Sequence, residues 1–172
     1  MNWMGVIPAV TTPFHADLSV VHDFFARHVG WLVENGCAGV VALGSLGEGA
    51  TLTFEEKEAV LRTAVKTLEG RAPVVAGVSA LSTEEAVRVA KMAQDAGCAG
   101  LMVLPPYVYT GDWREMKAHA GAVLRATPLS SMLYNNPVAY KTDFVPEQVG
   151  ELLAEHGNLH AIKESSADVR RV

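Results

Sequence analysis

An α/β fold with a parallel sheet is predicted by three features of this 172-residue sequence. Short apolar runs alternate with amphipathic stretches along the chain. A Gly-Cys-Ala-Gly unit followed by an apolar run begins at Gly36 and again at Gly97, which fits two helix-and-strand units of about 30 residues each. The composition, 49% hydrophobic and 19% charged, is that of a folded globular domain. Such alternation with short connections implies parallel strands joined by right-handed crossovers.

Six segments have the composition of strands, being short, apolar and bounded by glycine, proline or asparagine. In chain order they are "MGVIPAVTTP", "AGVVALGS", "GRAPVVAGVS", "GLMVLPP", "TPLSSMLYNNP" and "GNLHAIKESS".

The segments between these strands carry helix start and stop signals. Capping patterns predict helix starts in "TFEE", "STEE" and "DWRE", and a proline suited to a first helical position stands at Pro146. Glycines predict the helix ends, at Gly36, Gly70, Gly97 and Gly157.

Two architectures fit this pattern, an open doubly wound sheet and a (β/α)8 barrel. The first expects a Gly-x-Gly-x-x-Gly turn after the first strand, and "VTTPFHAD" has none. Polar residues instead follow several different strands, as in a barrel whose loops share one face. We therefore expect a (β/α)8 TIM barrel. Such a barrel has eight units and about 250 residues, so residues 1–172 are expected to form an incomplete barrel domain of six units, truncated after the sixth strand.

Several classes of function are disfavoured by composition. The formal net charge is −5 and no stretch clusters Lys and Arg, which argues against a nucleic-acid partner. No stretch reaches the roughly 18 apolar residues of a membrane span, and the N-terminus does not resemble a signal peptide, so we expect a cytoplasmic protein. Cys37 and Cys98 are expected to be buried free thiols. The histidines lack zinc-like spacing, and no metal or organic cofactor is implied.

Lys163 is the residue that most needs an explanation, because it lies inside the last apolar run. Period-2 alternation places Leu159, Ala161 and Lys163 on one face and Ile162 on the other, toward the helices. Burial disfavours the charged ammonium, and a neutral amine can attack a ketone to form a Schiff base. A solvated lysine that protects the edge of the sheet fits the pattern equally well.

Two further features could complete a site around this amine. Tyr134 ends the fifth strand, where a phenol can move protons during Schiff-base formation, although an isolated tyrosine is more often a core aromatic. The glycines of "GSLGEG" after the second strand permit a turn whose amides could hold an anion, although a plain strand-to-helix turn explains them too.

Five motifs together resemble one family. "AVTTPF", "GSLGE", "PPY", "YNNP" and "IKES" are similar, in order and spacing, to the N-terminal part of the dihydrodipicolinate synthase / N-acetylneuraminate lyase family. These enzymes are Schiff-base-forming (class I) aldolases, synthases and dehydratases that act on pyruvate or other 2-oxo acids. The resemblance implies a lyase with a small 2-oxo acid substrate, no cofactor, and assembly as a homotetramer, a dimer of dimers.

The resemblance also implies roles for individual residues. Lys163 matches the lysine that forms the imine, and Tyr134 matches the tyrosine that relays protons. Ser45 takes the place of the hydroxyl that continues this relay, and Tyr107 that of the tyrosine contributed by a neighbouring subunit. The Ser45–Leu46 turn matches the one that holds the substrate carboxylate.

Two departures from the family pattern bear on the reaction. Leu46 stands where a second Ser or Thr is usual. Ala139 stands where true dihydrodipicolinate synthases have an arginine for the second substrate's carboxylate, and loss of that bidentate partner is not a conservative change. We therefore expect an aldolase or dehydratase, that is, a carbon-carbon or carbon-oxygen lyase. The alternatives are dihydrodipicolinate synthase itself despite the missing arginine, or a non-catalytic fragment, since six strands cannot close an eight-stranded barrel.

Overall fold

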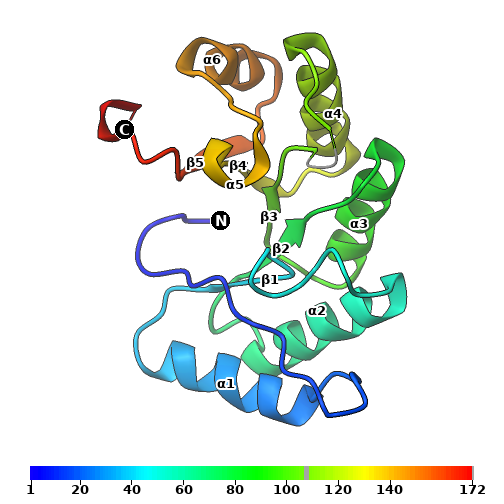
Figure 1. The fold of residues 1–172 in the computed structure, drawn as a ribbon. Helices are drawn as coiled ribbons and strands as arrows, with labels where there is room; N and C mark the ends of the chain where they lie inside the picture. Colours follow the sequence, from blue (N-terminus) through cyan, green and yellow to red (C-terminus); the bar gives the residue numbers. More distant parts are fainter. Residues whose placement is uncertain (107–108, 172) are drawn as a thin grey trace.

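The computed structural model describes residues 1–106 and 109–171 of the chain. Its centre is a sheet of five parallel strands whose order in space follows their order in the sequence. The strands are β1 (Val40–Ala42), β2 (Val74–Val78), β3 (Gly100–Val103), β4 (Ser130–Asn135) and β5 (Leu159–Glu164). Figure 1 shows the strands following one another along an arc, with the N-terminal segment on the side away from most of the helices.

The helices lie along the outside of this arc (Figure 1). The long ones are α1 (His22–Glu34), α2 (Phe54–Leu68), α3 (Thr83–Asp95), α4 (Trp113–Ala126) and α6 (Pro146–Glu155). A single helical turn, α5 (Pro137–Tyr140), directly follows β4, and a short 3₁₀ helix, η1 (Val169–Arg171), ends the described chain.

The first of the six expected strands does not form a regular strand, so the predicted count was wrong by one. The segment nevertheless runs parallel to β1. Val41 donates its backbone N–H to the carbonyl of Pro8 at 2.8 Å, and Val10 donates to the carbonyl of Val41 at 2.9 Å. Pro8 has no N–H to give to the ladder, which accounts for the interruption.

Most helix boundaries agree with the predicted signals. Reciprocal capping boxes begin α2 at Thr53 and α4 at Asp112, and the Ser82 hydroxyl accepts from the first turn of α3. Left-handed glycines end α1, α2 and α3. The helix end predicted at Gly157 is also confirmed, since α6 ends at Glu155 with His156 as its C-cap, but Gly157 does not take the left-handed conformation. His156, whose φ is −130°, is followed by a turn in which Leu159 donates its N–H to the His156 carbonyl at 3.1 Å.

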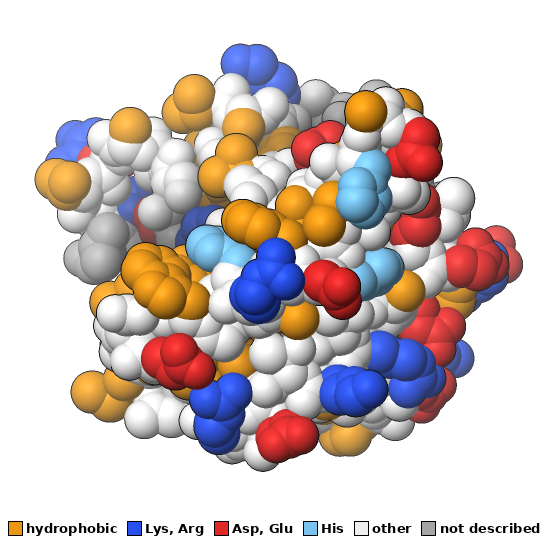
Figure 2. Space-filling view, turned by 90° about the horizontal axis from the view of Figure 1, so that it is seen from below, with side chains coloured by type: hydrophobic (Ala, Val, Ile, Leu, Met, Phe, Trp, Pro, Cys, Tyr) orange, Lys and Arg blue, Asp and Glu red, His pale blue; other side chains and the backbone are white. Residues whose placement is uncertain are grey.

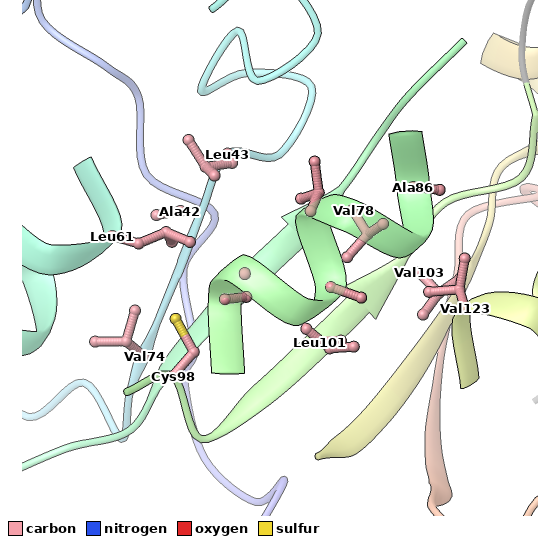
Figure 3. Packing of buried hydrophobic residues seen from close by; sticks show 14 of the residues in the cluster. Ala42, Leu43, Leu61, Val74, Val78, Ala86, Cys98, Leu101, Val103 and Val123 are labelled. Atoms are coloured by element: carbon pink, nitrogen blue, oxygen red, sulfur yellow. The ribbon is translucent and has the colours of Figure 1, made fainter. Parts of the chain in front are cut away.

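The main core lies between the sheet and the helices. Figure 3 shows side chains of β1, β2 and β3 on this side, with Val103 of β3 beside Val123 of α4. Both cysteines are free thiols, as expected. Cys98 is buried within this layer, but Cys37 is only partly buried, so the expected burial is confirmed for Cys98 alone.

A smaller apolar cluster covers the concave side of the sheet, away from the long helices. It contains Val41, Val75, Met102, Leu104 and Tyr134. Because strands β1 to β3 are apolar on both sides, they are buried throughout, as expected for parallel strands.

The outer surface carries charges of both signs. On the face shown in Figure 2, Lys and Arg side chains are interspersed with Asp and Glu. No helix within the described residues combines the length and the hydropathy needed to cross a membrane.

Candidate active site

Lys163 and Tyr134 lie opposite each other on neighbouring strands. Tyr134 of β4 is in register with Lys163 of β5. The lysine Nζ is 4.1 Å from the centroid of the tyrosine ring, a distance at which the ring face attracts a cation. The prediction that these two residues occupy adjacent strands is therefore confirmed.

The amine reaches the concave side because β5 is not regular. Ser131 pairs with Leu159, but the next residue, Met132, pairs with Ala161, so His160 forms a bulge. Leu159 packs in the helix-side core, whereas Ala161 and Lys163 line the concave side. Strict alternation had placed all three on one face. The bulge, which adds a residue to one strand, overturns that expectation for Leu159.

Lys163 borders an apolar cavity of about 310 Å³ on the concave side of the sheet. Among the described residues that line this space, it is the one with a charged side chain. The lining residues come from the N-terminal segment and from β1, β3, β4 and β5: Trp3, Gly5, Ile7, Ala9, Val41, Met102, Met132, Ala161, Ile162 and Lys163. The lysine is half-buried, so its amine faces an apolar space while it stays within reach of water.

Asn135 links the carboxyl ends of β4 and β5 from the helix side of the sheet, opposite the cavity. Its side-chain Nδ2 donates to Glu164 at 3.0 Å and to Asp143 at 3.1 Å, and its Oδ1 accepts from the N–H of Phe144 at 3.0 Å. Arg171 forms two hydrogen bonds to Asp143, which hold the pKa of that carboxyl below its usual value. The two strand ends that carry Tyr134 and Lys163 are thus tied to one another.

The turn after β1 is built around a residue with unusual backbone. Leu43 has a φ of 62°, a left-handed conformation that is strained for a leucine. A Cβ on Gly77 of β2 would lie 2.5 Å from the Leu43 carbonyl oxygen, so only glycine fits there. The Thr12 hydroxyl donates to the carbonyl of Gly47 at 2.6 Å and fixes the turn from the N-terminal segment.

This turn presents Ser45 and Leu46 at the surface. The amides of Gly47, Glu48 and Gly49 bond within the turn, while those of Ser45 and Leu46 donate to no acceptor among the described residues. Leu46 is 71% exposed. Two such amides and a hydroxyl are the groups that a carboxylate prefers in a backbone nest.

Tyr140 joins this turn to the end of β4, a contact that the sequence reasoning missed. Its phenol forms a hydrogen bond with the Ser45 hydroxyl, and its ring meets that of Tyr134 edge-on, with centroids 5.8 Å apart. Asn136 donates to the Tyr134 phenol oxygen at 3.0 Å. The sequence did carry a signal for this contact in "YNNPVAY". The single helical turn that begins at the proline reverses the chain and brings the second tyrosine back beside the first.

Tyr107 lies outside the described residues. The structure therefore brings Lys163, Tyr134, Ser45 and Leu46 to the concave side and its rim, and adds Tyr140 to them.

The sequence profile of the dihydrodipicolinate synthetase family matches residues 2–172. The chain belongs to this family. Among its curated relatives, the 4-hydroxy-tetrahydrodipicolinate synthase of Agrobacterium fabrum is 36% identical over 168 residues, and that of Alcanivorax borkumensis is 38% identical over 167 residues. The alignments cover 98% and 97% of this chain but 57% and 56% of those proteins.

Solved structures of the family superpose closely on the chain. A prophage protein of E. coli K12 from the dihydrodipicolinic acid synthase family, in complex with pyruvate, gives a TM-score of 0.95 at 30% identity. The dihydrodipicolinate synthase of Acinetobacter baumannii, complexed with pyruvate, gives 0.94 at 32%. Each match covers 99% of this chain and 57% or 58% of the other. The predicted TIM-barrel fold is thereby confirmed over the part that the chain covers.

The chain thus spans a little over half the length of the curated relatives that it matches. The family, its Schiff-base lyase chemistry and the N-terminal placement of the match agree with the predictions from the motifs. The individual site residues and the assignment of residues 1–172 to one incomplete domain stay predictions.

Proposed function

We propose that this chain carries the Schiff-base-forming site of a lyase that acts on pyruvate or another 2-oxo acid. The observation that carries the proposal is the pairing of Lys163 with Tyr134 beside an apolar cavity. Two relatives whose structures contain pyruvate support the choice of substrate.

In this mechanism Lys163 attacks the keto carbon as a free amine and forms a carbinolamine. Tyr134 then gives its proton to the departing hydroxyl, which leaves as water, and the C=N bond of the imine forms. The protonated imine accepts electrons from an adjacent C–C or C–H bond and so stabilises an enamine. Asn136 donates to the Tyr134 oxygen and stabilises the phenolate that remains.

The substrate carboxylate is placed at the turn after β1. The amides of Ser45 and Leu46 supply two donors there. The single proton of the Ser45 hydroxyl is kept for the relay. Leu46 has no side-chain donor, so the carboxylate depends on backbone groups at that position.

Ala139 favours an aldolase or dehydratase over 4-hydroxy-tetrahydrodipicolinate synthase, the name that its curated relatives carry. It is an exposed alanine in α5, and it offers no charge to a second carboxylate. A non-catalytic role is the competing proposal, because the chain spans little more than half the length of those relatives.

Borohydride trapping distinguishes these two proposals. The protein is incubated with pyruvate and sodium borohydride, and the modified peptide is identified by mass spectrometry. We expect a reduced adduct on Lys163 and none in Lys163→Met. Lys141, an exposed lysine directly after α5, serves as the internal control and should stay unmodified. A folded protein without an adduct on Lys163 would refute the imine mechanism.

The proposal also covers the oligomeric state of the protein and its place in the cell. On the family resemblance we propose a cytoplasmic homotetramer, in which Tyr107 of one subunit completes the relay of its neighbour. Analytical ultracentrifugation measures the assembly directly, and a strictly monomeric protein with full trapping activity would exclude a required contribution from a neighbour.

A further inference from the structure

The site contains a tyrosine that the family resemblance does not assign. Tyr140 ends α5, a single helical turn that begins at Pro137 and is capped by the Asn136 side chain, whose oxygen accepts from the N–H of Ala139 at 3.1 Å. The N–H of Tyr140 also donates to the Asn136 carbonyl at 3.0 Å. The phenol is therefore held by a short rigid element that continues directly from β4.

The contacts of Tyr140 join the two halves of the candidate site. Its hydroxyl bonds to Ser45, a residue 95 positions earlier in the chain, and its ring packs on the edge of Tyr134. The side chain is half-buried, so its hydroxyl reaches Ser45 while the residue keeps contact with solvent. Three hydroxyls of one chain, those of Tyr134, Ser45 and Tyr140, thus lie at one end of the sheet.

The charge state of Tyr140 suits the supply of protons. Burial raises the pKa of its phenol above the ordinary value, the hydrogen bond with Ser45 lowers it, and the nearby Tyr134 raises it. The net direction is upward, so Tyr140 holds its proton at neutral pH. A hydroxyl both donates and accepts, and a row of hydroxyls can therefore pass a proton along.

We propose that Tyr140 adds a further hydroxyl to the outer end of the proton relay, supplied by the same chain that supplies Lys163 and beside the Tyr107 expected from a neighbouring subunit. This inference rests on the proposed Schiff-base function. When Tyr134 gives its proton to the leaving hydroxyl, Ser45 returns a proton to Tyr134, Tyr140 returns one to Ser45, and Tyr140 takes one from water. The link between Ser45 and Tyr134 is the one that the family resemblance implies, and Tyr140 is the addition. Tyr140 acts through Ser45 and is a positioning residue that also supplies the proton.

The test is the rate of imine formation with pyruvate, followed by quenching with borohydride at set times. Tyr140→Phe keeps the ring and removes the hydroxyl. We expect it to slow adduct formation about 10- to 100-fold, less than the roughly 10²- to 10⁴-fold of a group that exchanges its proton with the substrate directly. The final amount of adduct at saturating pyruvate should not change. Tyr109→Phe, at an exposed tyrosine, is the matched control and should react at the wild-type rate.

A double-mutant cycle tests whether Tyr140 acts through Ser45. If Tyr140 acts through Ser45, then Ser45→Ala and the Ser45→Ala/Tyr140→Phe pair react at the same reduced rate. Circular dichroism and thermal melting establish that the variants are folded. An unchanged rate in Tyr140→Phe, or effects that multiply in the double variant, would overturn the relay while leaving the imine mechanism intact. Failure of the wild-type protein to form an adduct would instead overturn both.

Discussion

The two residues proposed to perform the chemistry, Lys163 and Tyr134, project from strands rather than from loops. Their relative position is fixed by the register of β4 and β5 and by the Asn135 side chain on the opposite side of the sheet. The sequence was sufficient to predict that these two residues lie on adjacent strands, because Tyr134 ends one recognisable apolar run and Lys163 lies inside the next. It was not sufficient for Tyr140, whose role depends on a contact with Ser45 that no local pattern encodes.

Tyr134→Phe is expected to reduce turnover about 10²- to 10⁴-fold, because a general acid-base group is lost while the ring remains. The apolar packing of the ring against Met102 and Leu104 should be preserved, so the melting temperature should change little. Steady-state kinetics on a 2-oxo acid substrate measures the effect. Full turnover in this variant would remove Tyr134 from the mechanism.

At the scale of single elements, the turn after β1 depends on a close approach between two strands. Leu43 takes a left-handed backbone, and its carbonyl passes against Gly77 of β2. The sequence pattern suggested a turn, since glycine-rich segments after strands form turns. It did not reveal that a glycine from the following strand is needed to hold it.

Gly77→Ala should therefore destabilise the protein and displace the Ser45 turn. The added Cβ would lie 2.5 Å from the Leu43 carbonyl oxygen and 2.8 Å from the Gly44 nitrogen. Overpacking of this kind costs about 1–3 kcal/mol of unfolding free energy. Urea denaturation measures the loss. Gly150→Ala, in α6 with no atom near the added methyl group, is the control and should be neutral or stabilising.

His119 in helix α4 makes the stability of the folded protein depend on pH. The ring is buried, lies 3.0 Å from the Thr83 hydroxyl and bonds to the backbone of Leu104. Burial lowers the pKa of His119 below its ordinary value of 6.5, and the Leu104 bond opposes this only in part. As the pH falls below about 6.5, the unfolded chain takes up a proton that the folded chain resists, so stability is lost.

We expect the unfolding free energy to fall more steeply from pH 8 to pH 5 in the wild-type protein than in His119→Gln. The pKa of His156 is also lowered, mainly by burial, so the variant should keep part of the slope. Equal slopes in the two proteins would show that His119 does not cause the loss.

At the scale of the whole molecule, the fold was predictable because its signals repeat. Each strand-and-helix unit carries its own capping residues and its own apolar run, so an error in one unit does not affect the next. The first segment failed as a regular strand because Pro8 lacks a donor, whereas the glycines that follow α1, α2, α3 and α6 all stand where a helix ends.

Leu101→Ala tests whether the sheet and its helices form one cooperative core. Leu101 is fully buried in the layer between β3 and the helices, and its truncation should cost about 2–5 kcal/mol. Leu81→Ala, at a leucine that is 57% exposed, should cost much less. Thermal unfolding followed by circular dichroism compares the two. A single transition that shifts as a whole in Leu101→Ala would be the expected result.

The extra residue at His160 has a consequence for how this strand tolerates changes in length. Because Leu159 already pairs with Ser131 and Ala161 with Met132, removing His160 would restore regular pairing without turning Lys163 away from its cavity. A deletion at Ile162 with the bulge still at His160 would reverse the direction of the lysine side chain. The bulged residue can therefore be lost with the reactive nitrogen still pointing inward, whereas Ile162, two positions later, cannot be lost while the bulge remains.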